Sequence, residues 1–198
     1  MGIASPLPNN RIARLLLCTA LLAFPARVGA QSALVVFGHG AYYAPLADLS
    51  DDGDDFASRF AFGLGVAAQI GQSVALRLSG TFVNTRYRGD ALAVSDSSVA
   101  RLYGMGDIQI GFPGTTSFVP YLILGAGVVR SDFRDPTVAA TSYPAMRFGG
   151  GFNYVSSIGA FFLEVLLTGH RHTGVPFSST QMDVAIQIGF AIAVLKIG

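Results

Sequence analysis

The 198-residue sequence has few charged residues, one cysteine and no tryptophan, and these scarcities exclude several classes of protein. Charged residues are 13% of the chain, against about 25% in ordinary soluble domains, and 51% are apolar. Because so few charges cannot cover a globule with a polar surface, a soluble enzyme is not expected. The single Cys18 excludes a disulfide framework and a cysteine zinc site. With 13 basic and 12 acidic residues, no positive field is available for a nucleic acid.

Long apolar runs are also missing from most of the chain. The uncharged stretch at residues 60–76, for example, is interrupted by glycines and glutamines, which makes it a poor membrane helix. The 24 glycines disfavour a bundle of long helices, because glycine is a weak helix former. A helical inner-membrane protein therefore stays only an alternative that the composition disfavours.

The first thirty residues have the layout of a secretory signal peptide. Arg11 and Arg14 precede an apolar run over residues 15–24, and small residues at 28–30 offer a cleavage site after Ala30. The apolar run is too short to span a bilayer as a helix. The sequence therefore predicts a cleaved signal peptide over residues 1–30.

The rest of the chain alternates apolar residues with small or polar ones, which is the period of a β-strand. In residues 182–194, for example, every even position from Met182 to Val194 is apolar. Each such segment has about the length that a tilted membrane strand needs. Eight segments follow the pattern: Leu34–Ala44, Arg59–Ile70, Val74–Tyr87, Arg101–Phe112, Tyr121–Phe133, Met146–Tyr154, Phe161–Arg171 and Met182–Val194.

The connections between these segments alternate between short and long. Short connections fall at residues 71–72, 113–117 and 155–159, and long polar ones at 47–55, 89–98, 134–144 and 173–181. Short periplasmic turns and longer outer loops are typical of an up-and-down membrane barrel. The predicted fold class is therefore all-β, an eight-stranded antiparallel up-and-down transmembrane β-barrel, with residues 31–198 as a single outer-membrane barrel domain.

The composition indicates which face of each strand is outside. A soluble barrel or sandwich points its apolar face inward and covers its outer face with lysine and glutamate. This chain has one lysine, Lys196, and one glutamate, Glu164. The apolar face is therefore predicted to contact lipid, and the small or polar face to line the lumen.

Charged residues on the lumen face are predicted to form ion pairs, because an unpaired buried charge is very unfavourable. Glu164 is expected at the centre, with Arg77 and Arg147 as its partners. An eight-stranded lumen holds side chains and little else, so a plugged barrel is expected, without a cofactor, a metal or a catalytic residue. The predicted lumen residues are Arg59, Gln69, Arg77, Arg101, Asp107, Gln109, Arg147, Asn153, Glu164, Asp183 and Gln187.

Aromatic residues near the segment ends suggest interfacial girdles, although ordinary strand propensity would also place aromatics there. The residues in question are Phe112, Phe118, Tyr121, Tyr154, Phe161 and Phe162 by the short turns, and Tyr42, Tyr43, Phe56, Tyr87, Phe133 and Tyr143 by the long loops.

Three segments resemble the small eight-stranded outer-membrane β-barrel family of the OmpA/OmpX type, also described as the outer-membrane β-barrel domain. They are Pro120–Val128, Phe162–Val165 and the last segment, Gln187–Val194, which looks like the signal read by the barrel assembly machinery. The chain departs from the family at Leu166, where a basic residue is usual, and at its non-aromatic end.

The resemblance implies a location in the outer membrane and contact with outer-membrane lipid and lipopolysaccharide. It also implies assistance from the barrel assembly machinery during insertion. The expected role is non-enzymatic: an envelope-structural or loop-presenting protein, with an extracellular ligand left open. A narrow porin-like channel is an alternative.

His170 and His172 are the residues most able to carry chemistry, since two histidines two apart share one face of a strand. Lipid A deacylases of the barrel type use a similar His-x-Ser pattern, so a lipid-A-modifying enzyme is the second alternative. Here His172 occupies the position of the serine, which favours a simpler role at the level of the lipid headgroups. An acidic stretch at residues 48–55 suggests weak association of divalent ions, because Arg59 stands where a calcium loop needs glutamate.

Overall fold

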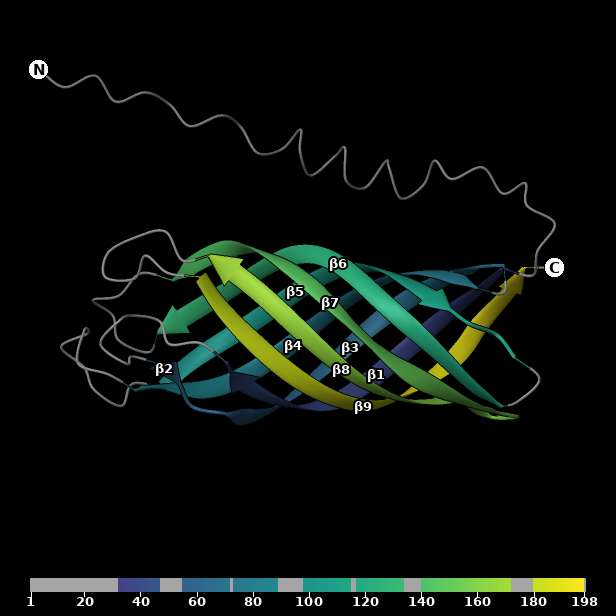
Figure 1. Cartoon of the computed structure of the whole chain (residues 1–198), viewed down its shortest axis with the longest axis horizontal. Helices are drawn as coiled ribbons and strands as arrows, with labels where there is room; N and C mark the ends of the chain where they lie inside the picture. The colour runs from purple at the N-terminus through teal and green to yellow at the C-terminus, as the bar shows by residue number, and fades with distance from the viewer. Residues whose placement is uncertain are drawn as a thin grey trace, which may run out of the picture.

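The computed structural model is a barrel of antiparallel β-strands (Figure 1). The structure describes residues 32–46, 55–71, 73–88, 98–114, 117–133, 140–171 and 180–197, and the predicted signal peptide, Asp48 to Asp54 and His172 lie outside these ranges. The strands are β1 (Ser32–Pro45), β2 (Asp55–Phe56), β3 (Arg59–Ile70), β4 (Val74–Arg88), β5 (Ser98–Gly111), β6 (Phe118–Phe133), β7 (Thr141–Ser156), β8 (Gly159–Arg171) and β9 (Thr180–Ile197).

The wall of the barrel is built from β1 and β3 to β9, each paired antiparallel with its neighbours along the chain. The first and last strands close it, with His39 of β1 opposite Gly189 of β9. Every predicted segment corresponds to one of these eight long strands, which confirms the predicted fold class. The two-residue β2, which pairs with β4, was not predicted and lies where the first long loop was expected.

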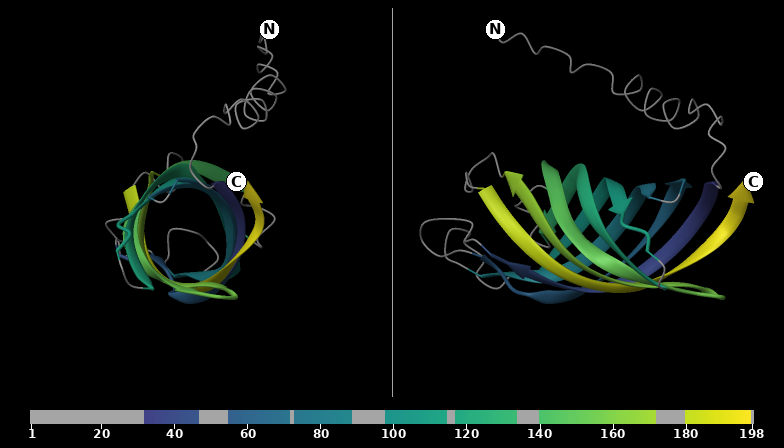
Figure 2. Two further views of the ribbon diagram at one scale, coloured as in Figure 1. Left: turned by 90° about the vertical axis from the view of Figure 1, so that its right-hand side faces the viewer. Right: turned by 45° about the vertical axis from the view of Figure 1, so that its right-hand side comes forward.

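The view along the barrel in Figure 2 shows the closed ring of strands, and Figure 1 shows its two ends. The turn end carries the start of β1, the end of β9 and the links β3–β4, β5–β6 and β7–β8; the opposite end is the loop end. Gly71 turns the chain after β3 with φ 68°, a backbone conformation that favours glycine. Between β7 and β8, the Ser156 hydroxyl donates to the Gly159 carbonyl over 2.8 Å. These links fall where the sequence predicts short turns.

The outer face of the wall is apolar, as the alternation predicts. Phe60, Leu64, Met146 and Ile188 expose between 65% and 81% of their surface. The immediate neighbours of the last three along the strand are buried or are glycines. A soluble protein would bury side chains of this kind. No helix within the described ranges is long and apolar enough to cross a membrane.

Several inward-facing glycines leave room for large neighbours in the lumen. A Cβ on Gly125 of β6 would overlap the Asp107 carboxylate, and one on Gly65 of β3 would overlap the ring of Phe37. Outward-facing Gly80, by contrast, has open space around it. Glycine on the lumen face therefore lets a narrow barrel enclose large polar and aromatic side chains.

Candidate functional site

The lumen of the barrel is lined by polar and charged side chains on alternate strand positions. In β5, Arg101, Tyr103, Met105 and Asp107 all point inward and are buried, and their even-numbered neighbours point outward. The same alternation operates in the other strands. The buried polar residues among those described are His39, Arg77, Ser79, Thr81, Thr85, Arg101, Asp107, Ser131, Arg147, Glu164, Thr168, His170, Gln181, Asp183 and Gln187.

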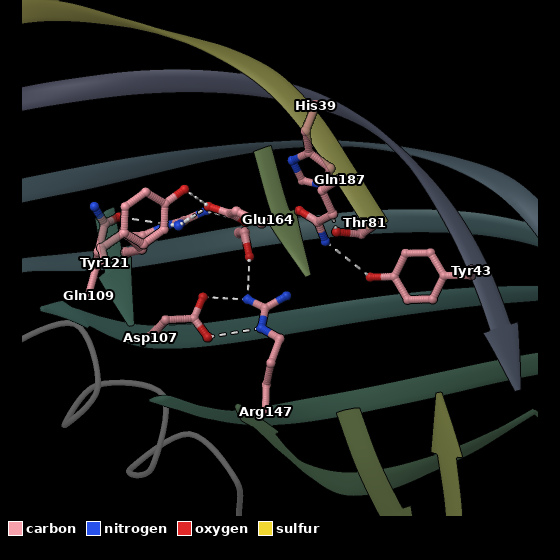
Figure 3. Close-up of polar contacts among 11 residues, drawn as sticks. His39, Tyr43, Thr81, Asp107, Gln109, Tyr121, Arg147, Glu164 and Gln187 are labelled. Atoms are coloured by element: carbon pink, nitrogen blue, oxygen red, sulfur yellow. Dashed lines mark hydrogen bonds and ion pairs between the residues drawn. The ribbon is translucent and has the colours of Figure 1, made fainter. Parts of the chain in front are cut away.

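The middle of the lumen is occupied by an ion pair between Arg147 of β7 and Asp107 of β5 (Figure 3). Arg147 donates through Nε to Oδ1 of Asp107 at 3.0 Å and through Nη2 to Oδ2. Its Nη2 also donates to the Ser79 hydroxyl over 3.1 Å. The two charged strands are separated by β6, where Gly125 lies between Asp107 and Arg147 in the register. The Arg147 and Asp107 side chains therefore meet over Gly125, which has no side chain to separate them.

A second ion pair lies nearer the turn end and crosses the lumen from β4 to β8. Arg77 donates through Nη1 to Oε1 of Glu164 at 2.5 Å and through Nη2 to Oε2 at 3.4 Å. The Tyr121 hydroxyl donates to the same Oε1 at 2.7 Å, and Gln109 accepts from Arg77 at 3.2 Å (Figure 3). The guanidinium also lies 4.7 Å from the centre of the Phe37 ring. Both charges are thus satisfied although both are buried.

The third ion pair, between Arg101 and Asp183, lies toward the loop end. Arg101 Nη2 donates to Oδ2 of Asp183 at 3.0 Å, and the Tyr103 hydroxyl donates to the same oxygen at 2.8 Å. His170 Nε2 lies 2.8 Å from Arg101 Nη2 and 3.0 Å from Oε1 of Gln181. His170 is buried within this cluster.

Aromatic side chains close the lumen beyond Arg101. Phe56 of β2 packs against Tyr87 and Phe133, and together with Val99 they form a buried cluster at the loop end. The Arg101 guanidinium lies 4.6 Å from the centre of the Phe56 ring, a cation–π distance. The short strand β2 therefore places the Phe56 ring against the Arg101–Asp183 ion pair.

Chemically, these contacts form a plug. Three guanidinium groups are matched by three carboxylates in a stack along the lumen, and each carboxylate accepts at least two hydrogen bonds from side chains. The described residues contain no group of three or more His, Cys, Asp or Glu side chains that could hold a metal ion. The arrangement fills the lumen where the three ion pairs lie.

The structure brings together most of the residues that the sequence assigns to the lumen, and it corrects two details. Arg59 is exposed at the loop end, because it is the first residue of β3 and lies beyond the enclosed part of the lumen. Arg147 pairs with Asp107, not with Glu164, because the register sets Arg147 and Asp107 level across β6. The residues found inside are Arg77, Arg101, Asp107, Gln109, Arg147, Glu164, Asp183 and Gln187, while Gln69 and Asn153 are more exposed and line the turn-end opening.

His170 and several aromatics also lie elsewhere than predicted. His170 points into the lumen and not to the headgroup level, because it lies six residues after Glu164, an even spacing that keeps both on one face. For the girdles, Phe112, Phe118, Tyr154, Phe161 and Tyr42 are exposed as predicted. Those predicted to be interfacial but buried inside are Tyr121, Phe162, Tyr43, Phe56, Tyr87, Phe133 and Tyr143.

The predicted lumen set left out several buried polar residues, among them Thr81, Tyr103, Tyr121, Ser131 and Gln181. His39 Nε2 lies 3.0 Å from the Thr81 hydroxyl, and Gln187 donates to the Tyr43 hydroxyl over 3.5 Å (Figure 3). Strand parity was the available signal. Each of these residues either lies on the same strand face as a charged residue that the sequence assigns to the lumen, or lies opposite a residue of that face in the neighbouring strand.

Fold and lumen together define a β-barrel of the outer-membrane type, with an apolar outside and paired charges inside. No family model matches the sequence, and no curated protein matches it.

Among solved structures, the chain is similar to neisserial surface protein A, with a TM-score of 0.59 and 12% identity over 82% of this chain and 98% of that one. It is also similar to the outer membrane protein OprG from Pseudomonas aeruginosa, with a TM-score of 0.58 and 15% identity over 83% of this chain and 96% of that one. These likenesses show that the chain has the fold of small eight-stranded outer-membrane barrels.

Proposed function

We propose that this protein is an integral, non-enzymatic outer-membrane β-barrel that spans the lipid bilayer and presents the connections at its loop end to the exterior. The observation that carries the proposal is the exposed apolar face around a closed wall, with the buried arginine, aspartate and glutamate side chains of the described residues paired inside it. An exposed apolar surface of this extent is unfavourable in water and favourable in lipid. The predicted signal peptide at residues 1–30 would start its export.

Exposed arginines at the loop end support this orientation. Arg86, Arg130 and Arg171 lie near the loop ends of β4, β6 and β8, and each is exposed beside a buried neighbour, which directs it outward. Guanidinium groups at this level suit the phosphates of lipopolysaccharide. We therefore place the loop end in the outer leaflet and the turn end on the periplasmic side.

The two alternatives receive less support from the geometry. A lipid-A-modifying enzyme that used His170 would need this residue to reach lipid, whereas His170 is buried in the lumen against Arg101 and Gln181. His172, the other candidate, lies outside the described residues. An open channel would need a continuous path, whereas three ion pairs and the aromatic lid at Phe56 occupy the lumen. A structural or loop-presenting role needs neither.

The proposal is tested by membrane fractionation of cells that express the chain, followed by electrophoresis of boiled and unboiled samples. We expect the protein in the outer-membrane fraction, and we expect the unboiled form to migrate differently because the closed barrel resists detergent. Recovery in the inner membrane or in the soluble fraction would overturn the proposal. Lipid A from the same cells, compared by mass spectrometry with lipid A from cells expressing His170→Ala/His172→Ala, separates the enzymatic alternative; we expect identical spectra.

A further inference from the structure

The lumen is not filled along its whole length, since a cavity of about 520 Å³ occupies the turn end. Its lining includes the turn residues Ser73, Ser157 and Ile158, which are exposed, so the cavity opens at that end. Its inner limit is the ion pair of Arg77 and Glu164. The volume falls within the range of roughly 300–1,000 Å³ that is usual for small-molecule sites.

Small lumen-facing residues in the part of the barrel nearest the turns create this space. Ala67, Ala75, Gly111 and Ala191 line the cavity. In β5, the lumen-facing positions farther from the turns carry larger side chains, among them Met105, Tyr103 and Arg101. The barrel is therefore filled toward the loop end and hollow toward the turn end.

The lining is mainly apolar, with a few polar groups and no net charge. Arg77 and Glu164 are the charged residues among those lining the cavity, and they neutralise each other through two hydrogen bonds. Three carboxamides, Gln69, Gln109 and Asn153, lie on the walls, and each offers both donors and an acceptor. A charged ligand would lose its hydration here without gaining a counter-charge, which is unfavourable.

Apolar surface lies beside these carboxamides. Phe37 and Phe162 line the cavity and pack edge to face with their ring centres 6.0 Å apart, and Val35 and Val119 extend the apolar wall. A suitable ligand therefore combines an apolar face with several hydroxyl or amide groups. Uncharged pyranose sugars have this combination in a molecule that fits the volume.

We propose that this cavity is a binding site for an uncharged sugar unit of one or two rings, entering from the turn end. Gln69, Gln109 and Asn153 would hydrogen-bond its hydroxyl or acetamido groups, and Phe37 and Phe162 would contact its apolar face. The site goes beyond the proposed function and depends on the barrel fold alone, so its test is made on the purified protein in lipid nanodiscs.

Access to the cavity is tested first with single cysteines introduced in a Cys18→Ser background. Ala67 and Ala61 are both buried alanines on the lumen face of β3, but only Ala67 lines the cavity, and Ala61 packs in the filled part. We expect a small water-soluble methanethiosulfonate to modify Ala67→Cys at least tenfold faster than Ala61→Cys. Equal rates at the two positions would overturn the claim that the turn end holds a cavity open to water.

Ligand class is then tested by protection of Ala67→Cys from the same reagent. We expect methyl glucoside and N-acetylglucosamine to slow the modification in a saturable manner, and glucuronate and glucosamine, which carry a charge, to have little effect. Protection by none of these sugars, or equal protection by the charged ones, would contradict the proposal.

A matched pair of asparagine variants assigns any protection to the cavity wall. Asn153→Ala removes a lining carboxamide and should weaken protection about tenfold, whereas Asn84→Ala, on the outward face near the loop end, should leave it unchanged. Equal protection in both variants would contradict the assignment of Asn153 to the wall that binds the sugar. None of these results depends on where the protein resides in the cell, so they are distinguishable from a failure of the proposed location.

Discussion

Glu164 illustrates at the scale of single residues how this barrel keeps charges inside. It accepts hydrogen bonds from Arg77 and from the Tyr121 hydroxyl while it is almost fully buried. The attraction in such a pair is largely offset by the loss of hydration of both groups. The pair fixes the arrangement of the two side chains, because removing only one partner leaves the other charge buried and unpaired, which is strongly unfavourable.

We predict that Glu164→Ala lowers the free energy of unfolding by about 3–5 kcal/mol, because it leaves the Arg77 cation buried without its partner. The double variant Arg77→Met/Glu164→Met should recover most of the loss, since it removes both charges and refills the space. Urea unfolding in lipid vesicles, followed by circular dichroism, measures both. Arg130→Ala, at an exposed arginine, serves as the control and should change stability by less than about 0.5 kcal/mol. A Glu164→Ala protein as stable as the parent would show that the pair is not buried as described.

Which charged residues form ion pairs with each other was harder to predict from the sequence than which residues face the lumen. Parity within a strand indicates that Arg147 and Asp107 face inward, but their pairing depends on the register of β5, β6 and β7 together. Arg59 shows the other difficulty: it has inward parity, yet it lies beyond the enclosed lumen because β3 begins there. The stagger between neighbouring strands decides which residues lie at the same depth in the barrel. This stagger cannot be derived from the pattern within a single strand.

At the scale of the strand, two-residue periodicity separates lipid-facing from lumen-facing positions. β3 shows this clearly, with Phe60, Phe62, Leu64 and Val66 exposed and Ala61, Gly63 and Ala67 buried between them. The pattern was readable from the sequence because a strand presents successive side chains to opposite faces. The unpredicted β2 has only two residues and thus no period to detect.

We predict that a charge on the outer face of β3 destabilises the barrel according to its depth in the bilayer. Leu64 lies in the middle of the strand and Phe60 near its loop end, and both are highly exposed. Leu64→Arg should cost about 2–4 kcal/mol of stability, and Phe60→Arg about 0–1 kcal/mol. Equilibrium unfolding in vesicles distinguishes the two. Equal effects of the two substitutions would indicate that the outer face does not cross a bilayer.

At the scale of the whole molecule, the eight strands enclose two different compartments. The part toward the loop end is filled by three ion pairs and closed by aromatic residues around Phe56, and the part toward the turn end is an open cavity. Strand number, connection lengths and the direction of the apolar face were predictable from composition and periodicity. The uneven filling was not, because it depends on which small residues come to the same level from different strands.

Spin labels on β9 test whether the apolar outer face is embedded in lipid. Ile186 and Ile188 are exposed on the outer face, and Ala185, which has the opposite parity, faces the lumen. A nitroxide attached to a cysteine at each position, in the Cys18→Ser background, is measured in lipid vesicles for collisions with oxygen and with a water-soluble nickel chelate. We predict that labels at 186 and 188 collide often with oxygen and rarely with the chelate, and that the label at 185 collides rarely with either. Frequent collisions of the labels at 186 and 188 with the chelate would place that face in water and would show that it is not embedded in lipid.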